Sequence, residues 1–180
     1  MTLCVVRLIG EAEERRREVS LFFRPNIEKF EALKDTKSLI KCLKSKYSQD
    51  REIAARAIGR IKDSSALESL ATALNDRNDD VRHAVVRALP MLKDDRVVNH
   101  LIAALDDKGF RIQLAAIHGL EKLKDYRAIE PLIFISSMDN IFLSGDARRA
   151  LQGITGEDFG KNVTKWKEWW NENKEKLLKE

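Results

Sequence analysis

Turn-forming residues are scarce in this sequence, which has only eight glycines and three prolines among its 180 residues. Sheet-rich folds need such residues at frequent turns, so their scarcity favours helices. Long apolar runs are missing as well. No stretch approaches the roughly 18 residues of a membrane-spanning helix, and we therefore expect no membrane association.

Cysteine is rarer still, because Cys4 and Cys42 are the only two in the chain. With no C-x-x-C motif and no dense disulfide framework, we expect free thiols in a reducing compartment, and hence a cytoplasmic protein. Neither sign of charge dominates, since 33 basic and 29 acidic residues give a net charge of +4. This balance permits nucleic-acid binding but is more typical of solvated helical surfaces.

No catalytic or metal-binding constellation is recognisable in the sequence. The three histidines, His83, His100 and His118, form no H-E-x-x-H or H-x-H motif, and no His-Glu dipeptide occurs. Glycine-rich phosphate loops and the G-x-S-x-G nucleophile motif are also absent. We therefore predict that the protein is not an enzyme and binds no cofactor or metal ion.

The strongest signal that is present is an internal repeat with a period of 31 residues. When the chain is aligned with itself at this shift, residues of one kind fall into four columns, three of them aliphatic and one of them small. The aliphatic columns are Leu39, Leu70, Leu101 and Leu132; Ile58, Leu89, Leu120 and Leu151; and Ile61, Leu92, Leu123 and Ile154. The small column is Ala57, Ala88, Gly119 and Ala150.

Each repeat is predicted to contain two helices separated by a polar turn. Between residues 67 and 97, Leu67, Leu70 and Leu74 recur at helical spacing, and the polar run 75–80 follows them. A second helical face then runs from Val81 to Leu92. Two short helices cannot bury their apolar faces alone, so we expect the repeats to stack on one another.

Within this repeat, the sequences DVRHA (80–84) and RALPMLKD (87–94) resemble HEAT-like repeats, and more narrowly the short repeats named after phycobilisome lyases. The resemblance covers residues 26–156 and implies an all-α, right-handed α-solenoid of about four and a half helix pairs. It says little about function, because such repeats serve many partners. The implied single domain spans 21–180, with a half-repeat at 26–35, repeats at about 36–66, 67–97, 98–128 and 129–156, and a Trp-rich capping helix at 161–178.

The repeats depart from the family pattern in two ways. Arg51 and Arg82 occupy a position where HEAT-like repeats place an arginine that pairs with an aspartate of the preceding turn, but Gln113 and Ser144 follow them. The resemblance therefore implies an arginine–aspartate ladder only in the first half of the chain. Pro90, near the end of its helix, lacks a backbone donor and should end that helix early.

A Lys-Asp pair recurs where one repeat joins the next, at positions 34–35, 62–63, 93–94 and 124–125. A lysine in the last turn suits the negative end of the helix dipole, and the aspartate can cap the next helix. We therefore interpret the pair as a structural joint and not as a catalytic pair.

The two ends of the chain differ from the repeats. Residues 1–20 are predicted to be a solvated or disordered extension, and one hypothesis is that the natural chain starts at Val19. Near the C-terminus, we expect the tryptophans of the final helix, Trp166 and Trp170 among them, to cover the exposed core of the last repeat. The alternative is an aromatic docking patch, a secondary binding patch with Trp169 turned outward.

One face of the second helices is predicted to be exposed and to bind a partner. At about 100° per residue, the positions opposite the core fall into rows that cross the stack. One row is basic, and apolar residues beside it are predicted to form an exposed patch. The predicted partner-binding residues are Arg56, Arg87, His118 and Arg149 in the basic row, with His83, Val86, Leu114 and Ile117 beside it.

Three functions stay open at this point. The first is a monomeric scaffold or adaptor that binds another protein or an acidic peptide on the inner, concave face. The second, suggested by the resemblance, is an accessory subunit or lyase-like chaperone acting on a protein that carries a prosthetic group. The third, nucleic-acid binding, is less favoured because the inner face lacks aromatic residues that could stack on bases.

Overall fold

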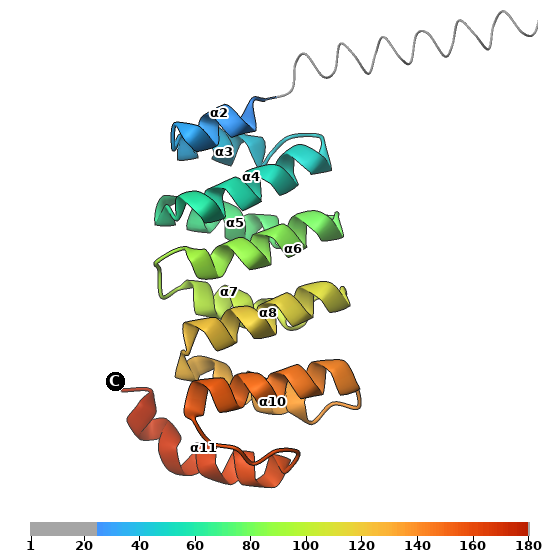
Figure 1. Cartoon of the computed structure of the whole chain (residues 1–180), viewed down its shortest axis with the longest axis vertical. Coiled ribbons are helices and arrows are strands. Elements are labelled where there is room, and N and C mark those ends of the chain that lie inside the picture. The colour runs from blue at the N-terminus through green and yellow to red at the C-terminus, as the bar shows by residue number, and fades with distance from the viewer. Residues whose placement is uncertain (1–24, 180) are drawn as a thin grey trace, which may run out of the picture.

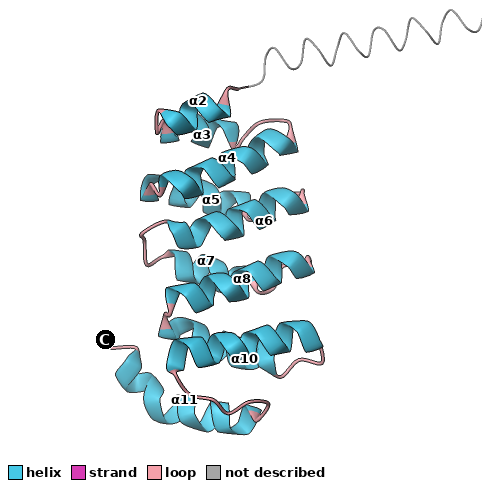
Figure 2. Ribbon diagram, viewed as in Figure 1, coloured by secondary structure: helices cyan, strands magenta, loops and turns pink. Residues whose placement is uncertain are grey.

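A computed structural model describes residues 25–179, which form a stack of helix pairs (Figure 1). All regular elements in this range are helices, which confirms the predicted all-α solenoid (Figure 2). The predictions for residues 1–20, including the hypothetical start at Val19, lie outside the described residues. Within the described range, no helix is long and apolar enough to cross a bilayer.

The helices follow one another as antiparallel pairs. α2 (Ile27–Ala32) precedes the first pair, and α11 (Val163–Leu177) follows the last pair and packs against its first helix. The pairs are α3 (Thr36–Cys42) with α4 (Ser48–Ile61), α5 (Leu67–Ala73) with α6 (Asp79–Ala88), α7 (Val97–Ala104) with α8 (Phe110–Leu123), and α9 (Ile129–Ser136) with α10 (Ile141–Thr155). Short 3₁₀ helices are η1 (Ser64–Ala66), η2 (Leu89–Met91) and η3 (Tyr126–Ala128).

The stack has two layers and two edges. The second helices of the pairs, α4, α6, α8 and α10, lie side by side and form what we call the second-helix face (Figure 1). The turns within pairs lie at one edge, the turn edge, and the connections between pairs lie at the opposite edge, the joint edge (Figure 2). Each second helix therefore begins at the turn edge and ends at the joint edge.

Two of the repeat columns form the centre of the core. One column lies on the first helices and begins at Leu39, and the other lies on the second helices and begins at Ile58. All eight side chains of these two columns are fully buried. Exposure is 0% for Leu39, Leu70, Leu101, Leu132, Ile58, Leu89, Leu120 and Leu151. Burial of a leucine or isoleucine side chain contributes roughly 1.5–3 kcal/mol, so these columns are a main source of the stability of the stack.

The Lys-Asp pairs are structural, as predicted. The carboxylate of Asp35 accepts a hydrogen bond from the backbone N–H of Ser38 at 3.0 Å, and so caps α3. Asp63, Asp94 and Asp125 each accept from the N–H two residues further on. Such bonds satisfy backbone donors that have no partner within the helix.

Pro90 ends α6 early, which confirms the prediction for this residue. α6 has 10 residues, whereas α4 and α8 each have 14. The 3₁₀ helix η2 replaces the last helical turn, because proline has no N–H to continue the α-helical pattern. Lys62 and Lys124 end α4 and α8 in the left-handed conformation (φ 62° and 55°), but Lys93 at the end of η2 does not adopt it.

The arginine–aspartate ladder exists in the first half, but the predicted direction of pairing is wrong. Arg51 donates two hydrogen bonds to Asp76, at 2.6 and 2.7 Å, and Arg82 donates two to Asp107, at 2.7 and 3.1 Å. These aspartates belong to the following turn. The preceding turn supplies a backbone carbonyl instead, that of Ser45 for Arg51 at 2.9 Å and that of Asp76 for Arg82 at 2.8 Å. Each arginine therefore links two successive repeats.

Candidate protein-binding surface

The basic row predicted from the sequence lies exposed on the second-helix face. Arg56, Arg87, His118 and Arg149 come from α4, α6, α8 and α10, one from each helix, and all four are exposed. Because successive second helices stand side by side, the four side chains follow the long axis of the stack.

The exposed apolar patch predicted beside this row does not exist. Val86 and Ile117 are both 0% exposed, and Leu114 is half-buried. The prediction assumed that each second helix buries only one side. In the stack, α6 also packs against α4 and α8, so its flanks are covered as well. Val86 and Ile117 therefore belong to the core between neighbouring second helices and not to a free surface.

A groove of about 670 Å³ runs between α6 and α8 on the second-helix face. Of the predicted residues, five line it: His83, Val86, Arg87, Leu114 and His118. Six other lining residues were not predicted, and two of them, Ala115 and Gly119, are small residues of α8. The other four are Pro90, Met91, Arg111 and Lys122.

A second groove, of about 310 Å³, lies between α4 and α6. Arg56 and Arg60 line one side of it, and Arg87 and Met91 line both this groove and the groove between α6 and α8. Arg60, Met91 and Lys122 stand one helical turn after members of the basic row. Extending that row by four positions along each helix is the signal that would have found them.

Most cations of this surface already have acidic partners. Arg56 pairs with Glu52 at 2.6 Å, and Arg60 donates to Glu31 on α2 at 2.7 Å. Arg111 reaches Asp80 only at 3.5 Å. Exposed pairs of this kind contribute roughly 0–1 kcal/mol, so a stronger acidic ligand can displace them at little cost.

Arg87 and Lys122 differ from these residues, because neither forms an ion pair with another described residue. Arg87 is exposed on α6 and Lys122 is exposed in the last turn of α8, so the two cations stand on opposite walls of the groove between α6 and α8. An anionic group placed between them would meet positive charge from both sides.

The environment of His83 shows that the groove has a positive potential. Burial lowers the pKa of His83, and the charges of Arg111, Arg87 and Arg56 lower it further, against a smaller opposing effect of Asp80. Three arginines from three successive second helices therefore act on one imidazole. Burial and these charges both favour the neutral form of His83.

The basic surface ends at α10. The carboxylate of Asp146, whose side chain is 12% exposed, pairs with Arg149 and lies 3.9 Å from Nε2 of His118. Arg149 therefore has an acidic partner, as Arg56 and Arg60 do, and neither groove described above includes a residue of α10. Trp169, predicted to face outward on α11, is half-buried and packs against the core.

The stacked helix pairs and the grooves between their second helices define a helical-repeat protein of the α-solenoid class. The chain belongs to the HEAT repeat family, whose pattern matches residues 36–121 and 75–152, together more than half of its length. A search of curated proteins finds no match.

Solved structures share the fold. The complex of CpcE and CpcF of phycocyanin lyase from Nostoc sp. PCC7120 aligns with a TM-score of 0.55 and 22% identity, over 76% of this chain and 69% of that one. An engineered protein aligns with a TM-score of 0.52 and 22% identity, over 67% of this chain and 62% of that one. At this level of identity the likeness establishes the architecture alone.

Proposed function

We propose that this protein is a non-catalytic adaptor that binds an acidic segment of another protein on its second-helix face. The observation that carries the proposal is the groove between α6 and α8, where Arg87 and Lys122 have no acidic partner among the described residues. Carboxylates of a ligand would supply the missing partners through charge-assisted hydrogen bonds.

The shape of the surface supports a polypeptide ligand. The groove combines cations with partly exposed apolar groups, since Leu114, Pro90 and Met91 line it beside Arg87. A polypeptide with both apolar and acidic side chains can contact the apolar groups as well as the cations, whereas a simple anion would contact the cations alone. The surface also extends past Arg87 into the groove between α4 and α6, so it continues over more than one repeat.

A direct test measures binding of a fluorescein-labelled oligoglutamate peptide by fluorescence anisotropy. The double variant Arg87→Glu, Lys122→Glu should weaken binding by about tenfold for each reversed charge, because a hydrogen bond to a charged group contributes roughly 1.5 kcal/mol or more. Both side chains are exposed, so circular dichroism should show an unchanged helical fold.

The matched control is Lys165→Glu, Lys167→Glu on α11, where both lysines are exposed and lie away from the grooves. It changes the net charge by the same amount and should leave binding nearly unchanged. Equal losses in the two double variants would mean that the peptide senses only the overall charge, and the proposed surface would then be wrong.

A second candidate function is an accessory or lyase-like factor that acts on a protein carrying a prosthetic group. The likeness to a phycocyanin lyase complex supports it. The measurement is the absorbance spectrum of partners that co-purify with the protein from its natural source. A partner with a bound chromophore favours this candidate, and partners without any chromophore count against it.

Nucleic-acid binding is separated from both by a salt titration with labelled single-stranded DNA. Phosphate contacts release counterions, so binding through the basic row would fall steeply with salt. Failure to bind DNA at low salt, together with binding of oligoglutamate, would remove this alternative.

A further inference from the structure

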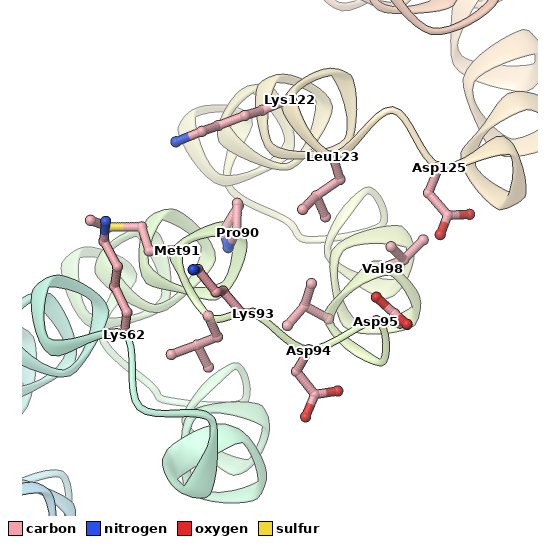
Figure 3. A pocket seen from close by; sticks show the side chains of 12 residues that line it. Lys62, Pro90, Met91, Lys93, Asp94, Asp95, Val98, Lys122, Leu123 and Asp125 are labelled. Atoms are coloured by element: carbon pink, nitrogen blue, oxygen red, sulfur yellow. The ribbon is translucent and has the colours of Figure 1, made fainter.

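A third cavity lies at the joint edge, where α6 passes into α7. This joint pocket has a volume of about 510 Å³ and draws residues from three successive joints (Figure 3). Its lining includes Lys62 from the end of α4, Lys93 from the connection after η2, and Lys122 from the end of α8.

The joint pocket lies where the backbone after α6 departs from the regular joint. At the regular joints a left-handed lysine ends the helix, as at Lys62 and Lys124. After η2, by contrast, Leu92 is extended (φ −74°, ψ 137°). The segment from Pro90 to Asp95 forms much of the pocket wall. The α-helical break at Pro90 is thus the local feature that sets this joint apart from its neighbours.

The joint pocket continues the grooves of the second-helix face. Pro90, Met91 and Lys122 line both the joint pocket and the groove between α6 and α8. Met91 lines the groove between α4 and α6 as well. All three hollows therefore meet at the short helix η2. The joint pocket also reaches Val97 and Val98 at the start of α7. The connected hollows therefore form a path that leaves the second-helix layer and bends round the joint edge toward the first helices.

The lysines of the joint pocket are available to an anion. Lys62, Lys93 and Lys122 form no ion pair with a described residue, and their ammonium groups lie toward Met91 and Pro90 (Figure 3). The carboxylates lie toward the opposite side of the view. Those of Asp94 and Asp125 are held by neighbouring arginines, Arg96 at 2.9 Å and Arg127 at 2.6 Å. The negative charge of these two carboxylates is therefore largely offset within the protein, whereas Asp95, the third in the lining, has no ion pair with a described residue.

The dimensions of the path favour an extended chain. Packed helices lie roughly 8–10 Å apart, whereas a helix with its side chains is about 10–12 Å across. A helix could rest on the second-helix face, but it could not sink between α6 and α8 or bend round Met91. An extended chain advances about 3.3 Å per residue and can turn at any residue.

We propose that the acidic ligand binds as an extended chain that runs through the groove between α6 and α8, passes Met91, and ends in the joint pocket on Lys62 and Lys93. This inference rests on the proposed function and specifies how that ligand is held. It predicts that affinity depends on the length of the ligand, because only a long chain reaches Lys93.

The test compares labelled tetraglutamate with labelled dodecaglutamate, which span about 13 and 40 Å when extended. Arg87→Glu should weaken binding of both peptides. Lys93→Glu should weaken dodecaglutamate about tenfold and change tetraglutamate by less than about twofold, relative to the control Lys165→Glu. Lys93 is exposed and outside the regular helices, so the fold should tolerate the change.

The outcomes separate this inference from the proposed function. If Arg87→Glu weakens both peptides but Lys93→Glu acts like the control, the groove binds acidic ligands and the continuation into the joint pocket is wrong. If neither variant differs from the control, both proposals fail. If an alanine-rich acidic peptide of equal charge binds as tightly as dodecaglutamate and stays helical by circular dichroism, the extended conformation is wrong.

Discussion

The turn edge of the solenoid changes character halfway along the chain. In the first half it is polar, and Arg51 and Arg82, which are 7% and 4% exposed, each hold an aspartate of the next turn. In the second half Phe110, Ile141 and Phe142 are 41%, 80% and 73% exposed at the same edge. The rings of Phe110 and Phe142 meet edge to face, with their centroids 6.2 Å apart.

The difference between the two halves separates two roles of the ladder arginines: a hydrogen bond to the preceding turn and an ion pair with the following one. The ion pairs join residues 25 positions apart, and the next pair at this spacing would be Gln113 and Met138. Gln113 still donates to the carbonyl of Leu105 in its own preceding turn, at 2.9 Å. A hydrogen bond to the preceding turn is therefore retained, although its acceptor is eight residues back instead of six. The ion pair that links one repeat to the next is lost, because neither of its two residues is present.

The largest expected effect comes from breaking the ladder. Arg82→Ala leaves the half-buried carboxylate of Asp107 without its cation and the carbonyl of Asp76 without its donor. We expect it to lower the free energy of unfolding by about 3 kcal/mol, as is typical when one partner of a buried ion pair is removed. Urea unfolding followed by circular dichroism measures the change.

Gln113→Ala is the matched variant in the second half. It removes only one neutral hydrogen bond and should cost about 1 kcal/mol. Equal losses for Arg82→Ala and Gln113→Ala would show that the inter-repeat ion pair adds nothing to the turn-holding bond, which would contradict the distinction between the two halves.

A smaller effect is expected from extending the ladder into the second half. In the first half Asp76 and Asp107 also accept the backbone N–H two residues on, at 2.9 and 2.7 Å. Met138 stands at the same offset before Asn140, the N-cap of α10, so an aspartate there should adopt the same geometry. The double variant Gln113→Arg, Met138→Asp should show a coupling of about 1–2 kcal/mol in a double-mutant cycle.

The control for this cycle replaces Met138 by asparagine, which matches aspartate in shape and lacks its charge. Coupling of the same size in the Gln113→Arg, Met138→Asn pair would show that shape, and not the ion pair, accounts for the stabilisation.

Features that depend on one repeat or on covalent geometry could be predicted from the sequence. The columns through Leu70 and Leu89 had to be buried, because each helix offers only one continuous apolar face. The early end of α6 follows from the missing N–H of Pro90. The loss of the ladder after Arg82 also follows, since Gln113 and Ser144 lack the guanidinium.

Features that depend on neighbouring repeats could not be predicted in the same way. The periodicity of a single helix places Val86 and Ile117 opposite the core, but it does not show that adjacent second helices cover these flanks. The carboxylate that accepts from Arg82 belongs to the following turn, and only the stacking of repeats brings it within reach. The joint pocket depends on the backbone after Pro90, which no column of the repeat describes.

Two glycines near the joint edge should respond to substitution by alanine with opposite changes in the free energy of unfolding. A Cβ added at Gly59 in α4 would lie 2.9 Å from the Cα of Ala88, so the backbone of α6 would have to move. Overpacking of this kind destabilises a protein by about 1–3 kcal/mol, whereas the higher helix propensity of alanine stabilises it by up to about 1 kcal/mol. Gly59→Ala should therefore destabilise the protein by about 1 kcal/mol in thermal or urea unfolding.

Gly153 in α10 is the comparison in the second half, although it stands one position later in its repeat than Gly59, which aligns with Gln152. Its added Cβ would meet only the side chain of Glu121, at 3.2 Å, and that flexible side chain can move away. Gly153→Ala should therefore stabilise α10 by up to about 1 kcal/mol through helix propensity. A stabilising Gly59→Ala would mean that α4 and α6 can separate at η2 more easily than their contacts indicate.

The smallest expected effect concerns the apolar half of the turn edge. Ile141 is the first residue of α10, and the equivalent residue of α6 is Asp79, whose carboxylate lies 2.8 Å from Arg82. Ile141→Asp places a negative charge at the N-terminus of a helix and removes an exposed apolar side chain. The helix dipole should then stabilise the protein by about 0.5 kcal/mol at low salt.

Ile141→Lys is the control, because it removes the same apolar group and brings the opposite charge. It should be slightly destabilising, and the difference between the two variants in thermal unfolding should shrink as salt screens the dipole. If both variants destabilise the protein equally at every salt concentration, Ile141 contributes through packing in spite of its exposure. The apolar turn edge would then be part of the fold, and its contrast with the arginine ladder would be one of chemistry and not of structural role.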